Sequence, residues 1–207
     1  AIAQITIPCD TTCLVESKSM KLYFNSFNQT KISSHKEVER IISRDLSAAT
    51  QGAVVVDLVA PGQFDTFNCG EISGRCIDDL DIAIEEYTVE PEVLCSNAEE
   101  MVEETLYSNL LKSNCLVTGQ PDWATVWIHY HGPRIDASSL LRYIVSFRQH
   151  NEFHEQCIER MFVDIIKQCH IEKLTVCGQY TRRGGVDINP FRSNFEENKS
   201  FIRTFRQ

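Results

Sequence analysis

The chain has 207 residues, enough for one large domain or two small ones. Hydrophobic residues make up 43% and charged residues 24% of it, proportions typical of a globular protein that exclude wholesale disorder. The net charge of −9 disfavours binding to a phosphate backbone, so we expect no direct contact with nucleic acid. Apolar runs are far shorter than the about 20 residues of a membrane helix. The nine cysteines show no C-x2-C spacing, a pattern typical of a protein in a reducing compartment. We therefore expect a soluble cytoplasmic protein without membrane contact.

The first third of the chain is predicted to form a strand, two helices and a second strand. Alternating apolar residues end at Pro8, helical spacing follows twice, and Gly52 stops the second helix before a continuous apolar run. The predicted strands cover residues 2–7 and 53–60, and the predicted helices cover 17–27 and 35–49.

The last half shows the same order after an opening hairpin. Two strands flank a loop from Cys115 to Asp122, and Asp136 is a suitable N-cap for the helix that follows. The predicted strands cover 104–111, 123–131 and 174–180. The predicted helices run from the Asp136 cap through Leu140 to Phe147 and over 153–169.

The two blocks match at a constant offset of 120 residues without a gap, as Tyr23 with Tyr143 and Val56 with Val176 illustrate. We therefore expect two tandem copies of one unit that share a site. The hairpin that opens the second copy has no counterpart in the first, so we expect the chain to begin inside its first copy.

Acidic residues are concentrated in the middle of the chain. Residues 65–104 hold 13 acidic residues and 1 basic residue, a pattern typical of a solvated segment. We expect an N-terminally incomplete first unit over 1–64, an acidic connecting segment over 65–104, and a second unit with the candidate nucleophile over 105–207.

Cys115 is a candidate nucleophile because it lies in a predicted loop whose turn contains Gly119 and Pro121. Asp122, seven residues on, could exchange protons with it. The alternative is a buried structural cysteine, which is the commoner role for any one cysteine.

His154 and Glu155 open a predicted helix, where His154 could shuttle protons and Glu155 is stabilised by the helix dipole. The alternative is an ordinary surface histidine and an ordinary N-terminal acid. Ile158 replaces the second histidine of H-E-x-x-H, which excludes a zincin site. Cys157 is one turn beyond His154, and core packing or a protective disulfide with Cys115 both remain open.

Arg183 and Gly184 lie in a T-R-R-G-G turn that could clamp a phosphate, or could be a basic surface turn. The chain has no G-x-G-x-x-G or Walker motif, so a nucleotide would bind outside those designs. His129 and His131 alternate on a predicted strand; we interpret this as an exposed strand face and expect no metal.

Four separated motifs occur along the chain: ESKSMKLYFNSF at 16–27, CLVTGQPDW at 115–123, NEFHEQC at 151–157 and YTRRGGVDINPFRSN at 180–194. In this order they resemble the NADPH-dependent 7-cyano-7-deazaguanine reductases, the nitrile reductases of queuosine biosynthesis. The resemblance is to the long form and covers nearly the whole chain. It implies an α+β fold of two tandem tunnelling-fold units, with antiparallel sheets and helix pairs on one face.

The resemblance also implies a reaction and the residues that perform it. Cys115 is the expected nucleophile, forming a covalent thioimide with the nitrile, and Asp122 the expected acid, helped by His154. Two NADPH per turnover would supply the hydrides, without a metal. The residues expected to bind the substrate are Val15, Glu16, Ser17, Phe153, His154 and Glu155. Those expected to bind NADPH are Ser17, Lys18, Arg183 and Gly184.

Two other functions stay open at this point. A cyclohydrolase-like enzyme on the same fold would need a metal-ligand set that the sequence does not show. A non-catalytic purine- or pterin-binding module would not need Cys115. For the nitrile reductase we expect a homodimer or a higher ring.

Overall fold

The computed structural model describes residues 1–63, 69–85, 87–197 and 202–207. The chain forms two compact units, residues 1–68 and 69–207, each with its own hydrophobic core. The predicted boundary between residues 64 and 65 lies outside the described residues. Of the helices in the described ranges, none is both long enough and apolar enough to cross a membrane.

The first unit contains the four elements that the sequence predicts. Its strands pair antiparallel, and its helices begin at side-chain caps, as when Ser34 accepts from the Glu37 amide at 3.2 Å. Ile42, Leu46 and Val56 lie in the core between helix and sheet. The elements are β1 (Ile2–Thr6), α1 (Ser17–Asn25), α2 (His35–Thr50) and β2 (Val55–Val59).

The second unit is built on a five-stranded sheet of order β3-β4-β5-β6-β7. All its strand pairs are antiparallel except β3 with β4. The sequence did not predict β3, β7 or the two 3-10 turns, which are only two or three residues long. The elements are β3 (Arg75–Cys76), η2 (Pro91–Val93), β4 (Ser96–Asn114), β5 (Pro121–Ile135), α3 (Ala137–Ser146), η3 (Phe147–Gln149), α4 (His154–Cys169), β6 (Lys173–Tyr180) and β7 (Phe191–Ser193).

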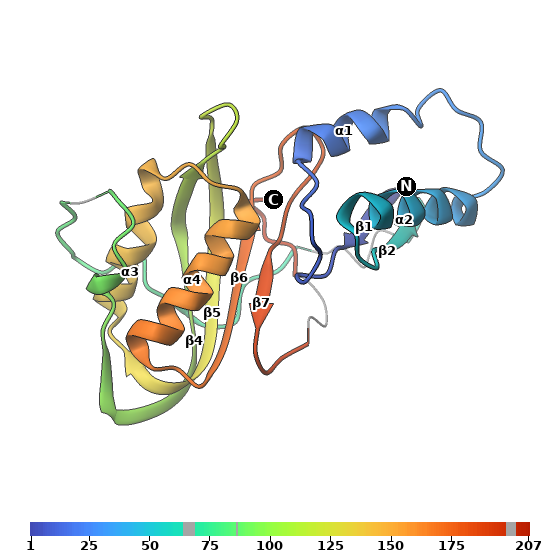
Figure 1. Cartoon of the computed structure of the whole chain (residues 1–207). Coiled ribbons are helices and arrows are strands. Elements are labelled where there is room, and N and C mark those ends of the chain that lie inside the picture. The colour runs from blue at the N-terminus through green and yellow to red at the C-terminus, as the bar shows by residue number, and fades with distance from the viewer. Residues whose placement is uncertain (64–68, 86, 198–201) are drawn as a thin grey trace. The chain divides into compact units, whose positions relative to one another are not determined.

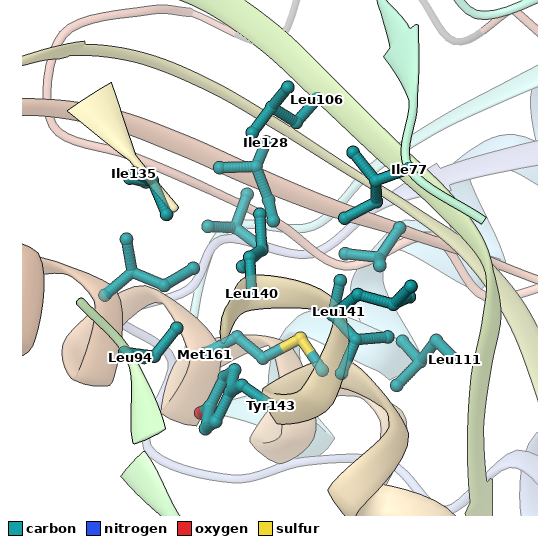
Figure 2. Packing of buried hydrophobic residues seen from close by; sticks show 14 of the residues in the cluster. Ile77, Leu94, Leu106, Leu111, Ile128, Ile135, Leu140, Leu141, Tyr143 and Met161 are labelled. Carbon is teal, nitrogen blue, oxygen red and sulfur yellow. The ribbon is translucent and has the colours of Figure 1, made fainter. Parts of the chain in front are cut away.

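Helices α3 and α4 lie on the same face of this sheet (Figure 1). The predicted cap is present, since the Asp136 carboxylate accepts from the Ser139 amide at 2.7 Å. Figure 2 shows Ile128 of the sheet facing Leu140 of α3 and Met161 of α4 in a fully buried layer. The predicted class, α+β with antiparallel sheets and helix pairs, is confirmed.

The two units repeat the same contacts. Tyr23 meets Phe27 edge-on with ring centroids 5.1 Å apart, and Tyr143 meets Phe147 in the same way at 5.3 Å. The serine before each phenylalanine donates to the tyrosine carbonyl at 2.6 Å in both units. The predicted gap-free match is wrong in one respect. The second helices begin at His35 and His154, an offset of 119, so one residue is gained or lost between the helices.

The acidic stretch differs from the predicted connecting segment. Ile77 and Leu94 are buried in the core of the second unit, and Ser96–Glu104 is the first half of β4. The described residues of 69–104 therefore belong to the compact unit that ends at Gln207. The sequence did not indicate that this stretch is part of the folded unit, because its many acidic side chains face outward while only a few apolar ones reach the core.

Candidate active site

Cys115 lies at the tip of the β4–β5 hairpin, immediately after Asn114. Its amide donates to the Gln120 carbonyl at 2.9 Å, and its own carbonyl accepts from the Gly119 amide at 2.8 Å. Gly119 has φ +65°, a conformation that side chains other than glycine rarely adopt. The turn thus holds Cys115 with 9% of its surface exposed. The predicted loop is confirmed, except that its last two residues already pair in β5.

Backbone hydrogen bonds tie this tip to the chain that precedes α4. The Asn114 amide donates to the His150 carbonyl at 2.8 Å, and the Glu152 amide donates to the Asn114 carbonyl at 3.3 Å. The Lys112 ammonium reinforces the junction by donating to the Asn114 side chain at 2.6 Å. The hairpin tip and the first turn of α4 therefore lie at the same end of the unit.

Asp122 and His154 meet at this end. His154 Nε2 lies 3.2 Å from Asp122 Oδ2, and the Asp122 side chain is 3% exposed. The Arg183 guanidinium bonds the other oxygen of Asp122 and also the side chain of Gln120. Asp122 is thus hydrogen-bonded from both sides, and Arg183 joins it to the loop of Cys115.

The two partners decide the charge of Asp122. Burial alone raises the pKa of this carboxyl, but hydrogen bonds from His154 and Arg183 outweigh burial and bring the pKa below its ordinary value. Asp122 is therefore ionised at neutral pH. An ionised carboxylate beside a cysteine loop is a proton acceptor.

Cys157 lies within α4 and is fully buried. Burial, followed by the charge of Glu152, raises the pKa of its thiol to about 12, although the nearby hydroxyls of Ser113 and Tyr180 partly oppose this. At neutral pH Cys157 is therefore protonated and a poor nucleophile. Of the two alternatives for Cys157, core packing is observed, and the disulfide with Cys115 stays a prediction.

The first turn of α4 presents the other expected substrate contacts of this unit. Phe153 is the N-cap residue, its amide donates to Gln156 Oε1 at 3.4 Å, and both Phe153 and Glu155 are half-buried. Glu155 lies in this first turn, where the helix dipole stabilises negative charge.

The turn after β6 fits a phosphate group. Gly184 has φ +58° and Gly185 has φ +82°, and a Cβ added at Gly185 would meet no atom within 4 Å. The backbone is therefore open to a ligand beside the Arg183 guanidinium, the side chain that suits a phosphate best. A phosphate here would compete with Asp122 and Gln120 for Arg183.

The remaining expected site residues, Val15, Glu16, Ser17 and Lys18, lie in the first unit. Glu16 is the N-cap of α1: its Oε2 accepts from the amides of Lys18 and Ser19, both at 2.9 Å, and its Oε1 accepts from the Lys18 ammonium at 3.2 Å. Burial raises the pKa of Glu16, but these bonds outweigh it and lower the pKa to about 2. The carboxylate is ionised and can accept further donors.

Two family models match the chain. One described as "Nitrile reductase, 7-cyano-7-deazaguanine-reductase N-term" matches residues 1–58, and one described as "QueF-like protein" matches residues 121–199. An NADPH-dependent 7-cyano-7-deazaguanine reductase from Chromobacterium violaceum is 52% identical over all of this chain and 74% of its own length. The chain belongs to the NADPH-dependent 7-cyano-7-deazaguanine reductases. As a member of this family it is an oxidoreductase that uses NADPH.

Other relatives carry the same name. The protein from Azoarcus sp. strain BH72 is 54% identical over 97% of this chain and 71% of its own length. The protein from Cupriavidus metallidurans is 55% identical over 94% of this chain and 71% of its own length. A solved structure, archaeosine synthase QueF-Like in the apo form, is also similar to this chain. The match spans 45% of this chain and 91% of that structure's chain, with 15% sequence identity and a TM-score of 0.40.

Against this family background, the structure adds contacts that the sequence reasoning missed. Gln120 and Tyr180 both lie within the motifs that carry the resemblance, yet neither was given a role. Gln120 bonds Arg183, and the Tyr180 ring stacks on the imidazole of His154 with centroids 3.8 Å apart. Their positions in the sequence could have indicated these roles. Gln120 lies two residues before Asp122, and Tyr180 is the last residue of a predicted strand.

The expected exposed face at His129 and His131 is wrong. Both side chains are half-buried, and His129 Nδ1 lies 3.0 Å from Glu196 Oε1. The ring of Phe195 lies 5.5 Å from that of His129. Phe195 and Glu196, which follow the short strand β7, cover His129, and this strand and the segment after it were not predicted.

In the described part of the chain, one group of three side chains of the kinds that bind metal ions lies close together. Ligand atoms of His150, Glu152 and Cys157 lie within 4.8 Å of one another. Glu152 already pairs with His150 at 2.7 Å and with Arg160 at 3.3 Å, and the Cys157 thiol is protonated. These contacts account for the group as an ion-pair network.

Proposed function

We propose that the chain reduces the nitrile of 7-cyano-7-deazaguanine to the primary amine, 7-aminomethyl-7-deazaguanine, through a covalent thioimide on Cys115. The product is used in the biosynthesis of queuosine, a modified tRNA nucleoside. One observation carries the proposal: Cys115 lies on a loop that Arg183 joins to the ionised, buried Asp122.

The first step is a proton-neutral addition. The sulfur of Cys115 attacks the nitrile carbon, the C–S bond forms, and one π bond of the nitrile breaks. Asp122 takes the thiol proton, and the same proton then moves to the nitrile nitrogen, with His154 hydrogen-bonded to the carboxylate throughout. A nitrile accepts hydride poorly and a protonated thioimide accepts it well, so covalent attachment divides a hard step into easier ones.

Carboxylates give the site its selectivity. In the second unit, Glu155 would accept N–H donors of the deazaguanine ring, and Phe153 would border the ring. In the first unit, Glu16 is the expected carboxylate acceptor, with Val15 and Ser17 beside it in sequence. A base with fewer donors would leave a carboxylate unpaired, which is costly in a closed site.

NADPH, when bound, would supply two hydrides, one to the protonated thioimide and one to the imine that remains after the C–S bond breaks and Cys115 leaves as the thiolate. Two protons from solvent complete the balance: one is carried on the nitrogen of the amine and one restores the Cys115 thiol. In the second unit, Arg183 and Gly184 would hold it, with the guanidinium and the glycine turn at a phosphate. In the first unit, Ser17 and Lys18 are the expected NADPH contacts. We place the enzyme in the cytoplasm as a homodimer or higher ring, without direct contact with nucleic acid.

Arg183→Gln is expected to raise KM for NADPH by about tenfold or more, because a charge-assisted hydrogen bond contributes about 1.5–3 kcal/mol. Arg182→Gln is the matched control, since Arg182 makes a surface ion pair with Asp187 at 3.8 Å. Steady-state kinetics of both variants check this. Equal KM values for the two would contradict a phosphate contact at Arg183.

The proposed function is tested by mixing the protein with 7-cyano-7-deazaguanine without NADPH and recording intact mass and absorbance. We expect a mass gain equal to the whole substrate, located at Cys115, that disappears when NADPH is added. Guanine, which lacks the nitrile, is the control and should give no adduct. A folded protein that binds the nitrile without a mass gain would support the binding module instead.

A further inference from the structure

Tyr180 contacts the candidate site from the end of β6. Its side chain is 1% exposed, and its ring stacks on that of His154 with planes inclined by 22° and centroids 3.8 Å apart. Its hydroxyl is buried near Ser113 and Cys157, and among the described residues no group makes a hydrogen bond of ordinary geometry with it. Tyr180 therefore lies between the sheet and the first turn of α4.

The ring of Tyr180 is held in place by its neighbours. A Cβ added at Gly178, two residues earlier on the same face of β6, would come within 2.7 Å of Ile158 and 3.2 Å of Tyr180. The missing side chain is what lets Ile158 of α4 and the tyrosine ring pack together. Because its hydroxyl end is also buried, the ring has little freedom to tilt.

His154 is oriented by two contacts. Nε2 points to Asp122 at 3.2 Å, and the Tyr180 ring fixes the plane of the imidazole. A hydrogen bond through one nitrogen leaves a ring able to rotate about that bond, whereas a stacked neighbour removes this rotation. Proton transfer depends steeply on such alignment, since a misplacement of about 1 Å can cost about 100-fold in rate.

We propose that Tyr180 is a positioning residue of the nitrile reaction, whose ring holds His154 in the plane in which it bonds Asp122. The proposal rests on the proposed function, in which His154 assists the proton transfer of Asp122. The ring carries this role, and the hydroxyl does not.

The experiment measures the rate of adduct formation at Cys115 with saturating 7-cyano-7-deazaguanine and no NADPH, and the affinity from its concentration dependence. Tyr180→Leu is expected to form the adduct about 10- to 100-fold more slowly, with little change in affinity. Tyr180→Phe keeps the ring and should stay within about threefold of the unchanged protein. Tyr143→Leu is the matched control, since Tyr143 is also fully buried but meets Phe147 edge-on and does not touch His154 through its ring.

Gly178→Ala is the second test, because the added methyl would clash with Ile158 at 2.7 Å and crowd the Tyr180 ring at 3.2 Å, while leaving every site residue present. Gly178→Ala should also slow adduct formation at Cys115. This result tests the role of the Tyr180 ring even if Tyr180→Leu does not fold. Full rate in Gly178→Ala or in folded Tyr180→Leu would overturn the proposal, as would a Tyr180→Phe variant slowed as much as Gly178→Ala. Absence of an adduct in the unchanged protein would instead overturn the proposed function.

Discussion

Replacing Cys115 with alanine is expected to abolish turnover, by on the order of 10⁴-fold or more, while 7-cyano-7-deazaguanine still binds. The thiol supplies the only bond that joins enzyme and substrate in the proposed reaction, so no partial substitute remains in its place. The measurements are NADPH oxidation in the presence of the nitrile, intact mass for the adduct, and calorimetry for binding.

Cys177 provides the control for this substitution. It is fully buried in β6, and burial raises the pKa of its thiol well above the ordinary range, so it acts as a small apolar side chain. Cys177→Ala is expected to lower stability by about 1–2 kcal/mol and to leave the adduct unchanged. If Cys115→Ala kept its turnover, the nucleophile assignment would fail and the binding module would become the better account.

Regular periodicity made most of the fold predictable. The helix from His35 to Thr50 was found within one residue, because its apolar positions recur at helical spacing and Gly52 follows its end. The Asp136 cap was found for the same local reason. By contrast, β4 was predicted from residue 104 although it begins at Ser96, because acidic residues dominate its first half.

The site was less predictable because its contacts span the sequence. Cys115, Asp122 and His154 were named from motifs, but the bond from Arg183 to Asp122 joins residues 61 positions apart. It depends on the register that pairs Ala124 with Tyr180 and so brings the turn after β6 to the hairpin tip. Periodicity and composition carry no information about that register, and Arg183 was therefore assigned to the cofactor alone.

Asp122→Asn is expected to slow adduct formation by about 10²- to 10⁴-fold, the usual contribution of a proton-transfer group. Asparagine has nearly the same shape and can still accept from Arg183, but it cannot take the proton of the Cys115 thiol. Substrate affinity should therefore change little, since only the proton path is removed. Asp187→Asn is the control, because Asp187 pairs with Arg182 at the surface. An adduct formed at full rate in Asp122→Asn would assign the proton transfer to another group.

The same variant has a stability signature whose sign follows from the pKa of Asp122, which lies below its ordinary value. A carboxyl with a lowered pKa in the folded state contributes stability above its unfolded pKa of about 3.9, and this is lost as pH falls through the folded value. Asp122→Asn should thus be less stable by about 1–3 kcal/mol at neutral pH, and the difference should shrink in acid. Urea unfolding at both pH values measures it. A difference that stayed constant would mean that Asp122 is not held as the carboxylate that the proton transfer requires.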